Sequence, residues 1–300
     1  MSLLNPFTAA KEDTKVSNEL KDFLTDFSIE VMPRTSAKIE SFTEILPKNT
    51  RVYIAHIEGV PIEEMVQTAK RISSEGFAVM PHFPARIIKN KNILEQWIKM
   101  YQDEAGIDQA LLLAGGVVSP HGDFKDSMQL VETELFEKYN FKNLHFAGHP
   151  EGNKDIDYDG STKNIDEALI WKQSYSERSD IDLAITTQFC FEADPVIEWA
   201  NSLIENGINI PIHIGVAGPA KLQTLIKFSI ACGVGPSLRV LQKRAKDIKK
   251  LLLPFEPNDF LETLARHKKT NPSFNITNIH FFPLGGINTN ATWINNAKNN

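Results

Sequence analysis

The stretch DLAITTQFCFEADPVIEWANSLIENGINIPIHIGVAG, from Asp182 to Gly218, decides the fold. It opens with an apolar, β-branched run that ends in polar residues, which is typical of a strand that meets a loop. Asp194 and Pro195 then supply the capping carboxylate and the early proline that begin a helix, and Gly207 is placed to end it. A second apolar run follows at 210–214. The stretch is therefore a βαβ unit, from which parallel α/β proteins are built.

The same alternation continues in both directions along the 300-residue chain. Apolar runs bounded by turn residues predict eight strands, at 27–32, 52–57, 77–81, 110–114, 144–147, 183–189, 210–214 and 279–284. Segments with helical periodicity lie between them, at 35–46, 61–75, 91–105, 124–139, 163–178, 195–206 and 219–232, with a last short one near 289–297. This order predicts a single (β/α)8 TIM-barrel domain over residues 1–300, in which residues 1–24 form an N-terminal extension and helix.

The interval between the seventh and eighth predicted strands is longer than one helix needs. It holds two further helical patterns, near 237–252 and 257–269, so we expect an elaborated crossover there. An open, doubly wound sheet is the alternative, because a sequence does not show whether the first and last strands pair. The chain has neither a GxGxxG motif nor a GxxxxGK[ST] phosphate loop, which disfavours that alternative.

The composition is that of a globular chain, since 42% of the residues are hydrophobic and provide enough apolar material for a core. A net charge of -6 argues against a nucleic-acid partner, because no basic face dominates. The most basic stretch, KRAKDIKK at 243–250, has the spacing of a solvated helix face, with an anion site as the alternative. The first residues do not form a secretory signal, and no run reaches the ~20 apolar residues of a membrane span. We therefore expect a soluble, cytoplasmic protein.

Polar residues fall where the predicted strands end. In a parallel barrel the active site is built at the carboxyl ends of the strands, so these residues are expected to meet at one mouth. They are Glu30, His56, Glu58, His82, His149, Glu151, Gln188 and His213, together with the glycine pairs Gly115-Gly116 and Gly285-Gly286.

Glu30 lies between Ile29 and Val31, so the alternation of side chains along a strand turns its carboxylate away from its apolar neighbours. A buried carboxylate is costly unless it is paired or used, and burial alone raises its pKa towards the range where it can act as an acid. A structural glutamate, paired for example with Arg34, is the alternative.

The other polar strand ends indicate ligand binding more than metal binding. His82, His149 and His213 lack the short, paired spacing of metal signatures such as HExxH, so we interpret them as hydrogen-bonded barrel histidines or ligand donors. The Gln188 amide can donate and accept at once, which suits the amide edge of a heterocycle, although it could also be a satisfied core amide. The glycine-rich segments LLLAGGVVSP, GVAGPAKL and FFPLGG would let the backbone approach a planar or phosphorylated ligand.

Several of these segments resemble the flavin-dependent methylenetetrahydrofolate reductases. They are SIEV around Glu30, MPHF around His82, LLLAGG, AGHPEG at 147–152, ITTQFCF, and IHFFPL at 279–284. The resemblance extends from about Phe27 to Trp293, and it is most specific in AITTQFCFEAD, where the family has Ile-Thr-Gln followed by aromatic residues and an aspartate.

The resemblance implies roles for individual residues. Glu30 would be the general acid that opens the imidazolidine ring of the folate, and Gln188 would bind the pterin, with Phe189 and Phe191 in the aromatic stretch beside it. Residues implied for the flavin site are His82, Gly115, Gly116, His149, Asp166 and Lys172. The family passes hydride from NAD(P)H through FAD to a reduced folate in one-carbon metabolism, and its short forms without a regulatory domain are often homo-oligomers.

Two positions depart from the family pattern. Where the family usually has Arg-Gly-Asp after strand four, this chain has Ala114-Gly115-Gly116. Where the family has an aromatic residue and Leu-Asn-Arg after strand eight, this chain has Leu284-Gly285-Gly286. Both changes remove charge from the implied flavin pocket. Two alternatives to the reductase therefore stay open: a folate-binding or one-carbon transfer protein that has lost flavin, and an unrelated barrel enzyme that holds a phosphorylated substrate at GVAGPAKL.

Overall fold

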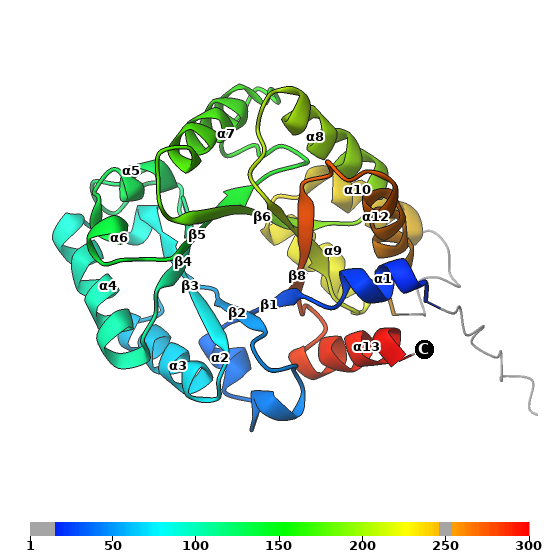
Figure 1. The fold of residues 1–300 in the computed structure, drawn as a ribbon, viewed down its shortest axis with the longest axis horizontal. Coiled ribbons are helices and arrows are strands. Elements are labelled where there is room, and N and C mark those ends of the chain that lie inside the picture. The colour runs from blue at the N-terminus through cyan, green and yellow to red at the C-terminus, as the bar shows by residue number, and fades with distance from the viewer. Residues whose placement is uncertain (1–15, 246–253, 300) are drawn as a thin grey trace, which may run out of the picture.

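The computed structural model describes residues 16–245 and 254–299. Its centre is a closed barrel of eight parallel strands, in which each strand pairs with the next and β8 pairs with β1 (Figure 1). The strands are β1 Phe27–Val31, β2 Arg51–Ile54, β3 Ala78–Pro84, β4 Gln109–Leu113, β5 Asn143–Gly148, β6 Asp182–Cys190, β7 Ile212–Ala217 and β8 Ile276–Phe282. The closure confirms the predicted (β/α)8 barrel and all eight strands, and it excludes the open sheet.

Helices surround the barrel (Figure 1). The α-helices are α1 Asn18–Phe23, α2 Pro33–Ser36, α3 Ile62–Ser74, α4 Lys91–Ala105, α5 Ser127–Val131, α6 Leu135–Lys138, α7 Lys163–Ser176, α8 Ala193–Glu205, α9 Leu222–Ala231, α10 Gly235–Ala245, α12 Asn258–Thr270 and α13 Ile287–Asn299, and the 3-10 helices are η1 Phe42–Glu44 and η2 Ala85–Ile87. Three of them, α9, α10 and α12, lie between β7 and β8, which confirms the elaborated crossover. The part of the predicted helix 237–252 that follows α10 lies outside the described residues. The same is true of the end of KRAKDIKK, from residue 246 to residue 250.

The continuous helix predicted over 35–46 is wrong. In its place the chain forms α2 and η1 with an irregular segment between them. The cause is tertiary: the Arg71 guanidinium on α3 donates to the backbone carbonyls of Ser36 and Ile39, and the Glu75 carboxylate accepts from the backbone N–H of Phe42 at 2.6 Å. These side chains satisfy the backbone groups that a helix would have paired internally.

The helix predicted over 124–139 is also interrupted. It is divided into α5 and α6 by Glu134, whose φ of 60° lies in the left-handed region. One residue in that conformation ends a right-handed helix, because the next peptide no longer lies along its axis.

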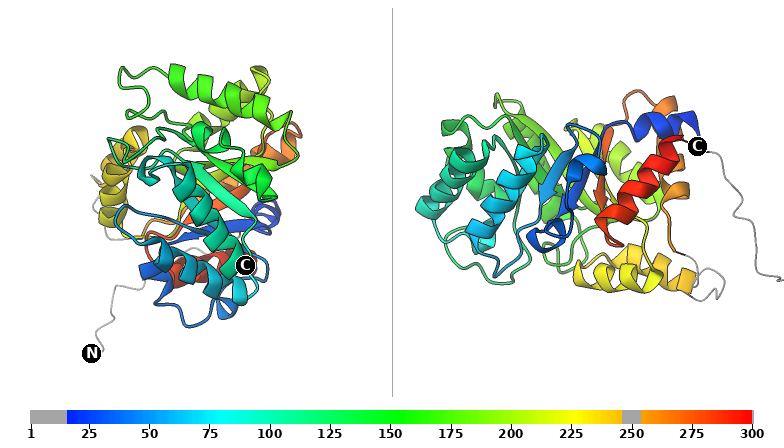
Figure 2. Two further views of the ribbon diagram at one scale, coloured as in Figure 1. Left: turned by 90° about the vertical axis from the view of Figure 1, so that its left-hand side faces the viewer. Right: turned by 90° about the horizontal axis from the view of Figure 1, so that it is seen from below.

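The inside and the outside of the barrel differ in polarity. Outward side chains pack under the helices, and Ile29 and Val31 of β1 belong to that large apolar cluster. Since side chains alternate along a strand, Glu30 between them faces the interior. At the carboxyl ends of β6 and β7 a second apolar cluster joins Phe189 and Phe191 to α9 and α10. The right-hand view of Figure 2 shows α9 and α10, in yellow, to one side of the other helices.

Within the described residues, no helix combines the length and the apolar character that crossing a bilayer requires.

Candidate functional site

The centre of the candidate site is the Glu30 carboxylate on β1. Its Oε2 lies 3.2 Å from Nε2 of His82, on β3, and 3.8 Å from Nε2 of His280, on β8. The Glu30 side chain is one-fifth exposed, whereas both imidazoles are buried. A carboxylate that water still reaches thus lies between two buried imidazoles. The three residues stand near the carboxyl ends of β1, β3 and β8, so the first and last strands of the chain both contribute to the site.

Glu30 is an anion in the free protein. Burial alone would raise the pKa of its carboxyl, but the polar contacts with His280 and His82, together with the positive charge these rings can carry, outweigh burial and lower the pKa to about 2. The expectation of a raised pKa is therefore wrong, because the sequence did not reveal the two histidine neighbours. Within the described part of the chain, the ion pairs of Glu30 are with these histidines and not with Arg34.

A buried polar network continues from His280 into the barrel. Ser28 Oγ lies 2.9 Å from His280 Nδ1, and the Tyr53 ring lies 4.3 Å from the His280 ring. Further in, Tyr53 Oη lies 2.6 Å from His145 Nδ1 and 3.2 Å from Thr186 Oγ1. Burial lowers the pKa of His280 despite the opposing charge of Glu30, lowers that of His145 well below its usual value, and raises that of Tyr53 to about 12. Burial therefore favours the uncharged forms of His280, His145 and Tyr53.

These network residues were missed in the sequence. The available signal was the same alternation that identified Glu30, because Tyr53 stands between Val52 and Ile54, and His280 between Ile279 and Phe281, with apolar residues on both sides. A polar residue at an alternate position of a barrel strand points inward. The pattern could have found each residue, although not its partner across the barrel.

The carboxyl end of β6 positions Gln188 through an irregularity in the β6–β7 pairing. Thr186 pairs with His213 and Phe189 with Gly215, so β6 has one residue more than β7 over this interval. Gly215 permits it: its N–H donates to Thr187 Oγ1 at 2.8 Å, and a Cβ added at Gly215 would lie only 2.4 Å from the Thr187 carbonyl oxygen. Bulges of this kind redirect side chains next to active sites.

Gln188 borders a small cavity of about 40 Å³ that His149, Cys190 and Cys232 also line. Its Oε1 accepts from the backbone N–H of Phe189 at 3.1 Å, which fixes the amide and directs Nε2 away from that bond. Phe189 and Phe191 are buried, and their rings pack edge to face at 5.8 Å. The two phenylalanines therefore support the wall behind Gln188 and do not present an open stacking face.

A larger pocket of about 500 Å³ lies beside this mouth, between the ends of β4 and β5 and helix α7. It is lined by Ala114, Ala147, His149 and Lys172 among others. The Lys172 ammonium is buried; it donates to the Ala147 carbonyl at 3.1 Å and lies over the Phe146 ring, and no carboxylate lies within ion-pair distance among the described residues.

Burial determines the charges in this pocket. It lowers the pKa of Lys172 to about 8, although the charge of Asp126 opposes the shift, and together with the charge of Lys172 it lowers the pKa of His149 to about 4. At neutral pH the pocket thus holds a buried cation beside a neutral imidazole, and Asp126, Asp155 and Glu167 also belong to its lining. A buried cation that no carboxylate contacts favours an anionic ligand at its own position.

The remaining residues implied for the flavin site, Gly115, Gly116 and Asp166, differ in their surroundings. Gly115 has φ +95°, and a Cβ there would touch Pro84 at 3.0 Å, whereas a Cβ at Gly116 would meet no atom within 4 Å. Asp166 lies on the exposed face of α7, where its carboxylate accepts from Thr162 Oγ1 at 2.8 Å, outside the lining of the 500 Å³ pocket.

The structure thus forms three groupings among the predicted residues. Glu30 lies with His82, Gln188 with His149, and His149 with Lys172, while Asp166 is separate. In the described part of the chain, no three histidine, cysteine, aspartate or glutamate side chains gather closely enough to hold a metal ion.

Comparison with known proteins places the fold but not a family. No family model matches the chain. The fold is similar to that of an uncharacterized protein from Clostridium thermocellum that binds two copies of 5-methyl-5,6,7,8-tetrahydrofolic acid; the TM-score is 0.57 at 12% identity, over 93% of this chain and 98% of that chain. At this identity the likeness shows a shared fold.

Two further matches are an enoyl-[acyl-carrier-protein] reductase (NADH) from Aquifex aeolicus VF5 and an actinorhodin polyketide ketoreductase with NADPH. The first is 12% identical to this chain and covers 78% of this chain and 95% of its own length. The second is 13% identical and covers 89% of this chain and 98% of its own length. Their TM-scores of 0.30 and 0.27 are too low to support any argument.

Proposed function

We propose that this barrel binds a reduced folate carrying a one-carbon unit at its carboxyl-terminal mouth, and that it acts on the folate as a flavin-dependent methylenetetrahydrofolate reductase. The observation that carries the proposal is the Glu30 carboxylate held between His82 and His280. The motif resemblance around Glu30 and Gln188 supports it, and so does the shared fold with a barrel that binds 5-methyltetrahydrofolic acid.

The chemistry begins with a proton. The imidazolidine ring of methylenetetrahydrofolate must open before its one-carbon unit accepts hydride, and the departing nitrogen needs a proton as its bond to carbon breaks. Because the Glu30 pKa of about 2 leaves the carboxyl unprotonated in the free protein, Glu30 would take up a proton from solvent once bound folate displaces water from the carboxylate and raises its pKa, and it would then pass that proton to the nitrogen. Glu30 is then again an anion beside the cationic iminium, and its charge stabilises that iminium.

Gln188 would orient the pterin. Its Oε1 is held by the Phe189 N–H, so the amide has a fixed plane and can present Nε2 to the carbonyl edge of a pterin. The buried Phe189 and Phe191 keep that plane in place, because their packing leaves little freedom to the end of β6. The role expected of the two phenylalanines is therefore support of the pterin site rather than direct stacking.

The flavin nucleotide would occupy the 500 Å³ pocket, and the buried Lys172 supports this placement. The pocket has a volume in the usual range of small-molecule sites, and the buried ammonium of Lys172 has no carboxylate partner among the described residues, so the phosphates of a dinucleotide would supply the missing charge. Lys172 would hold those phosphates, and His149 would line the same site. When bound, the flavin would carry hydride between NAD(P)H and the folate.

A flavin-free folate-binding or one-carbon transfer protein is the second candidate. The segment Ala114-Gly115-Gly116 favours it, because Gly116 leaves open space where the family pattern has an aspartate. The two candidates share the folate site and differ only in the cofactor.

Two measurements on the purified full chain test both candidates. We expect the visible absorption of bound flavin, and we expect a calorimetric titration with 5-methyltetrahydrofolate to show one saturable site. Folate binding in a colourless protein that does not take up added FAD would support the second candidate and exclude the reductase. Failure to bind folate, with or without FAD, would refute both.

A further inference from the structure

A second groove of ligand size lies at the opposite end of the barrel from Glu30. Its volume is about 670 Å³, within the range of roughly 300–1,000 Å³ that small-molecule pockets occupy. Lys142 and Ile181 line it, and they directly precede β5 and β6, so the groove opens at the amino-terminal ends of these strands. The proposed folate chemistry uses none of its residues.

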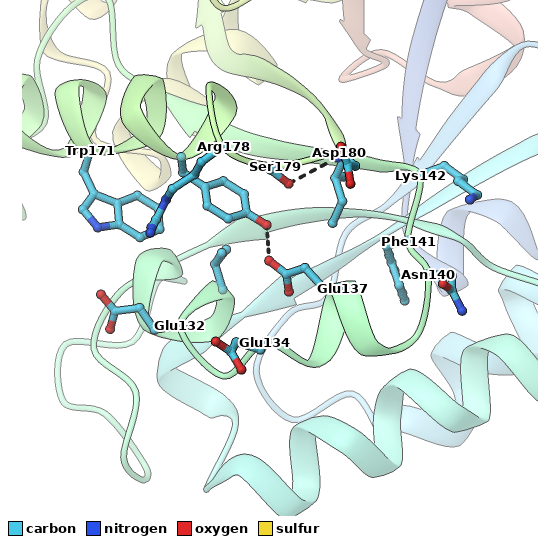
Figure 3. Close-up of a pocket in the computed structure, with 13 residues that line it drawn as sticks. Glu132, Glu134, Glu137, Asn140, Phe141, Lys142, Trp171, Arg178, Ser179 and Asp180 are labelled. Carbon is cyan, nitrogen blue, oxygen red and sulfur yellow. Dashed lines mark hydrogen bonds between the residues drawn. The ribbon is translucent and has the colours of Figure 1, made fainter.

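One wall of this groove is aromatic (Figure 3). On α7 the rings of Trp171 and Tyr175 are stacked, with centroids 5.6 Å apart and planes 10° apart. The Trp171 indole is labelled in Figure 3. Tyr175 is buried, its hydroxyl donates to the Glu137 carboxylate, and the Arg178 guanidinium lies 5.6 Å from its ring. The aromatic wall therefore already holds one cation of the chain itself, by a cation–π contact.

The facing wall is anionic. Glu132 and Glu134 project from the α5–α6 segment, on the opposite side of the groove from the Trp171 indole in Figure 3. Unlike Glu137, they have no ion pair and no side-chain hydrogen bond within the described residues, and both are exposed to solvent. Glu134 has φ 60°, an uncommon conformation for a glutamate, and it turns the chain at the edge of the groove.

The base of the groove is apolar. Val131, Phe141 and Ile181 line it and are almost fully buried, so the apolar surface they offer there is small. An apolar base between an indole and two unpaired carboxylates matches a ligand whose methylene chain contacts the base while its ammonium groups lie between the ring and the carboxylates. The lining also contains two cations of the chain, Lys142 and Arg178, against the four acids Glu132, Glu134, Glu137 and Asp180, so the groove is anionic on balance.

We propose that this groove binds an aliphatic diamine or polyamine. The site does not involve Glu30 or Gln188, although it adjoins the Lys172 pocket, because Trp171 lines both cavities. Two cationic ends and a flexible apolar chain are the features that its two carboxylates, indole and apolar base recognise together.

Calorimetry on the full chain at low ionic strength tests the proposal with putrescine and spermidine as probes. 1,4-Butanediol is the control ligand, because it has the same methylene chain without charge. We expect saturable binding of the amines and none of the diol. Absence of amine binding, or equal binding of the diol, would overturn the proposal.

Variants locate the site. Glu132→Gln combined with Glu134→Gln should weaken amine binding roughly fivefold or more, since each exposed carboxylate–ammonium contact contributes modestly. Trp171→Leu should weaken it about threefold through loss of the cation–π contact. The matched control is Glu63→Gln with Glu64→Gln, a pair of exposed acids at the start of α3, which should bind as the parent does. Equal weakening in the control pair, or undiminished binding in the Glu132/Glu134 variant, would show that amines bind the acidic surface without this groove.

Discussion

Glu30 and His82 lie 3.2 Å apart across the barrel mouth, on strands that do not neighbour each other. A second contact, with His280 on β8, depends on closure of the barrel, and the two histidines together hold the Glu30 pKa at about 2 against the effect of burial. Because the folded pKa is below the usual value of 4.5, the pairing stabilises the fold above about pH 4.5, and that stabilisation is lost as the pH falls through 2. The carboxylate at the centre of the site is therefore also a structural anion.

The first prediction concerns Glu30 in catalysis. Glu30→Gln keeps the shape of the side chain and removes the group that relays the proton, so we expect folate binding within a fewfold of the parent and a loss of reductase turnover of ~10²- to 10⁴-fold. Glu44→Gln, on the exposed η1 segment, is the control and should keep parental turnover. Reduction of methylenetetrahydrofolate at the parental rate by Glu30→Gln would mean that Glu30 is only structural.

A second prediction concerns pH and the buried imidazole of His213. Burial lowers its pKa from 6.5 to about 3, so between these values the unfolded chain binds a proton that the folded chain does not. Stability should therefore fall as the pH drops below 6.5, and at pH 5 this one group should cost about 2 kcal/mol. Denaturant unfolding at pH 7.5 and pH 5 should show a smaller difference in His213→Gln than in the parent. The exposed His121→Gln is the control, and an identical pH dependence in the parent and His213→Gln would contradict the prediction.

A third prediction tests the β6–β7 irregularity that positions Gln188. Gly215→Ala would place a Cβ 2.4 Å from the Thr187 carbonyl oxygen, so the strands must separate at this point. We expect a loss of about 1–3 kcal/mol in unfolding free energy and weaker folate binding, because the end of β6 would shift. Gly116→Ala, where the added Cβ meets open space, should change the unfolding free energy far less. Equal effects of the two substitutions would show that the irregularity does not need a glycine.

A fourth prediction separates the binding role of Lys172 from a structural one. Lys172→Met removes a buried cation that has no carboxylate partner in the described structure, so the melting temperature should hold or rise. FAD affinity should nevertheless fall at least ~10-fold, because the phosphates lose a charge-assisted contact. Lys163→Met, at the exposed start of the same helix, is the matched control. FAD affinity equal to that of the parent in Lys172→Met would place the cofactor outside this pocket.

The sequence predicted the barrel because every strand has a local signal, an apolar run bounded by turn residues. It predicted Glu30 and Gln188 for a similar reason, since a polar residue at a strand end is visible without knowledge of its neighbours. It did not predict His280 as a partner of Glu30, because Phe27 pairs with Ile279 only once the barrel closes. The predicted direction of the Glu30 pKa shift was wrong because neither the contact with His280 nor that with His82 was foreseen.

The two errors in the predicted helices also arise from contacts between residues that are distant in the sequence. Arg71 lies more than thirty residues from the carbonyl groups of Ser36 and Ile39 that it binds, and no local pattern in 35–46 indicates it. The left-handed Glu134 is likewise set by its surroundings, because glutamate has no intrinsic preference for that conformation. Periodicity identified the segments correctly, and tertiary contacts decided how far each helix extended.

The last prediction concerns the missing carboxylate at Gly116. In the family pattern an aspartate stands at this position, and here a side chain would enter open space, so Gly116→Asp should be accommodated without strain. A negative charge near the flavin disfavours the anionic reduced form. Without that charge the flavin is easier to reduce, and the reduced flavin is then a weaker hydride donor to folate. We therefore expect the parent, with flavin bound, to reduce folate more slowly than the family norm. We also expect Gly116→Asp to lower the flavin midpoint potential by tens of millivolts, on the order of the effect of one nearby charge. Gly116→Asn is the control, because it adds the same volume without charge and should leave the potential near that of the parent. A spectroelectrochemical titration in which Gly116→Asp shows no shift, or a rise, would mean that this loop does not face the cofactor.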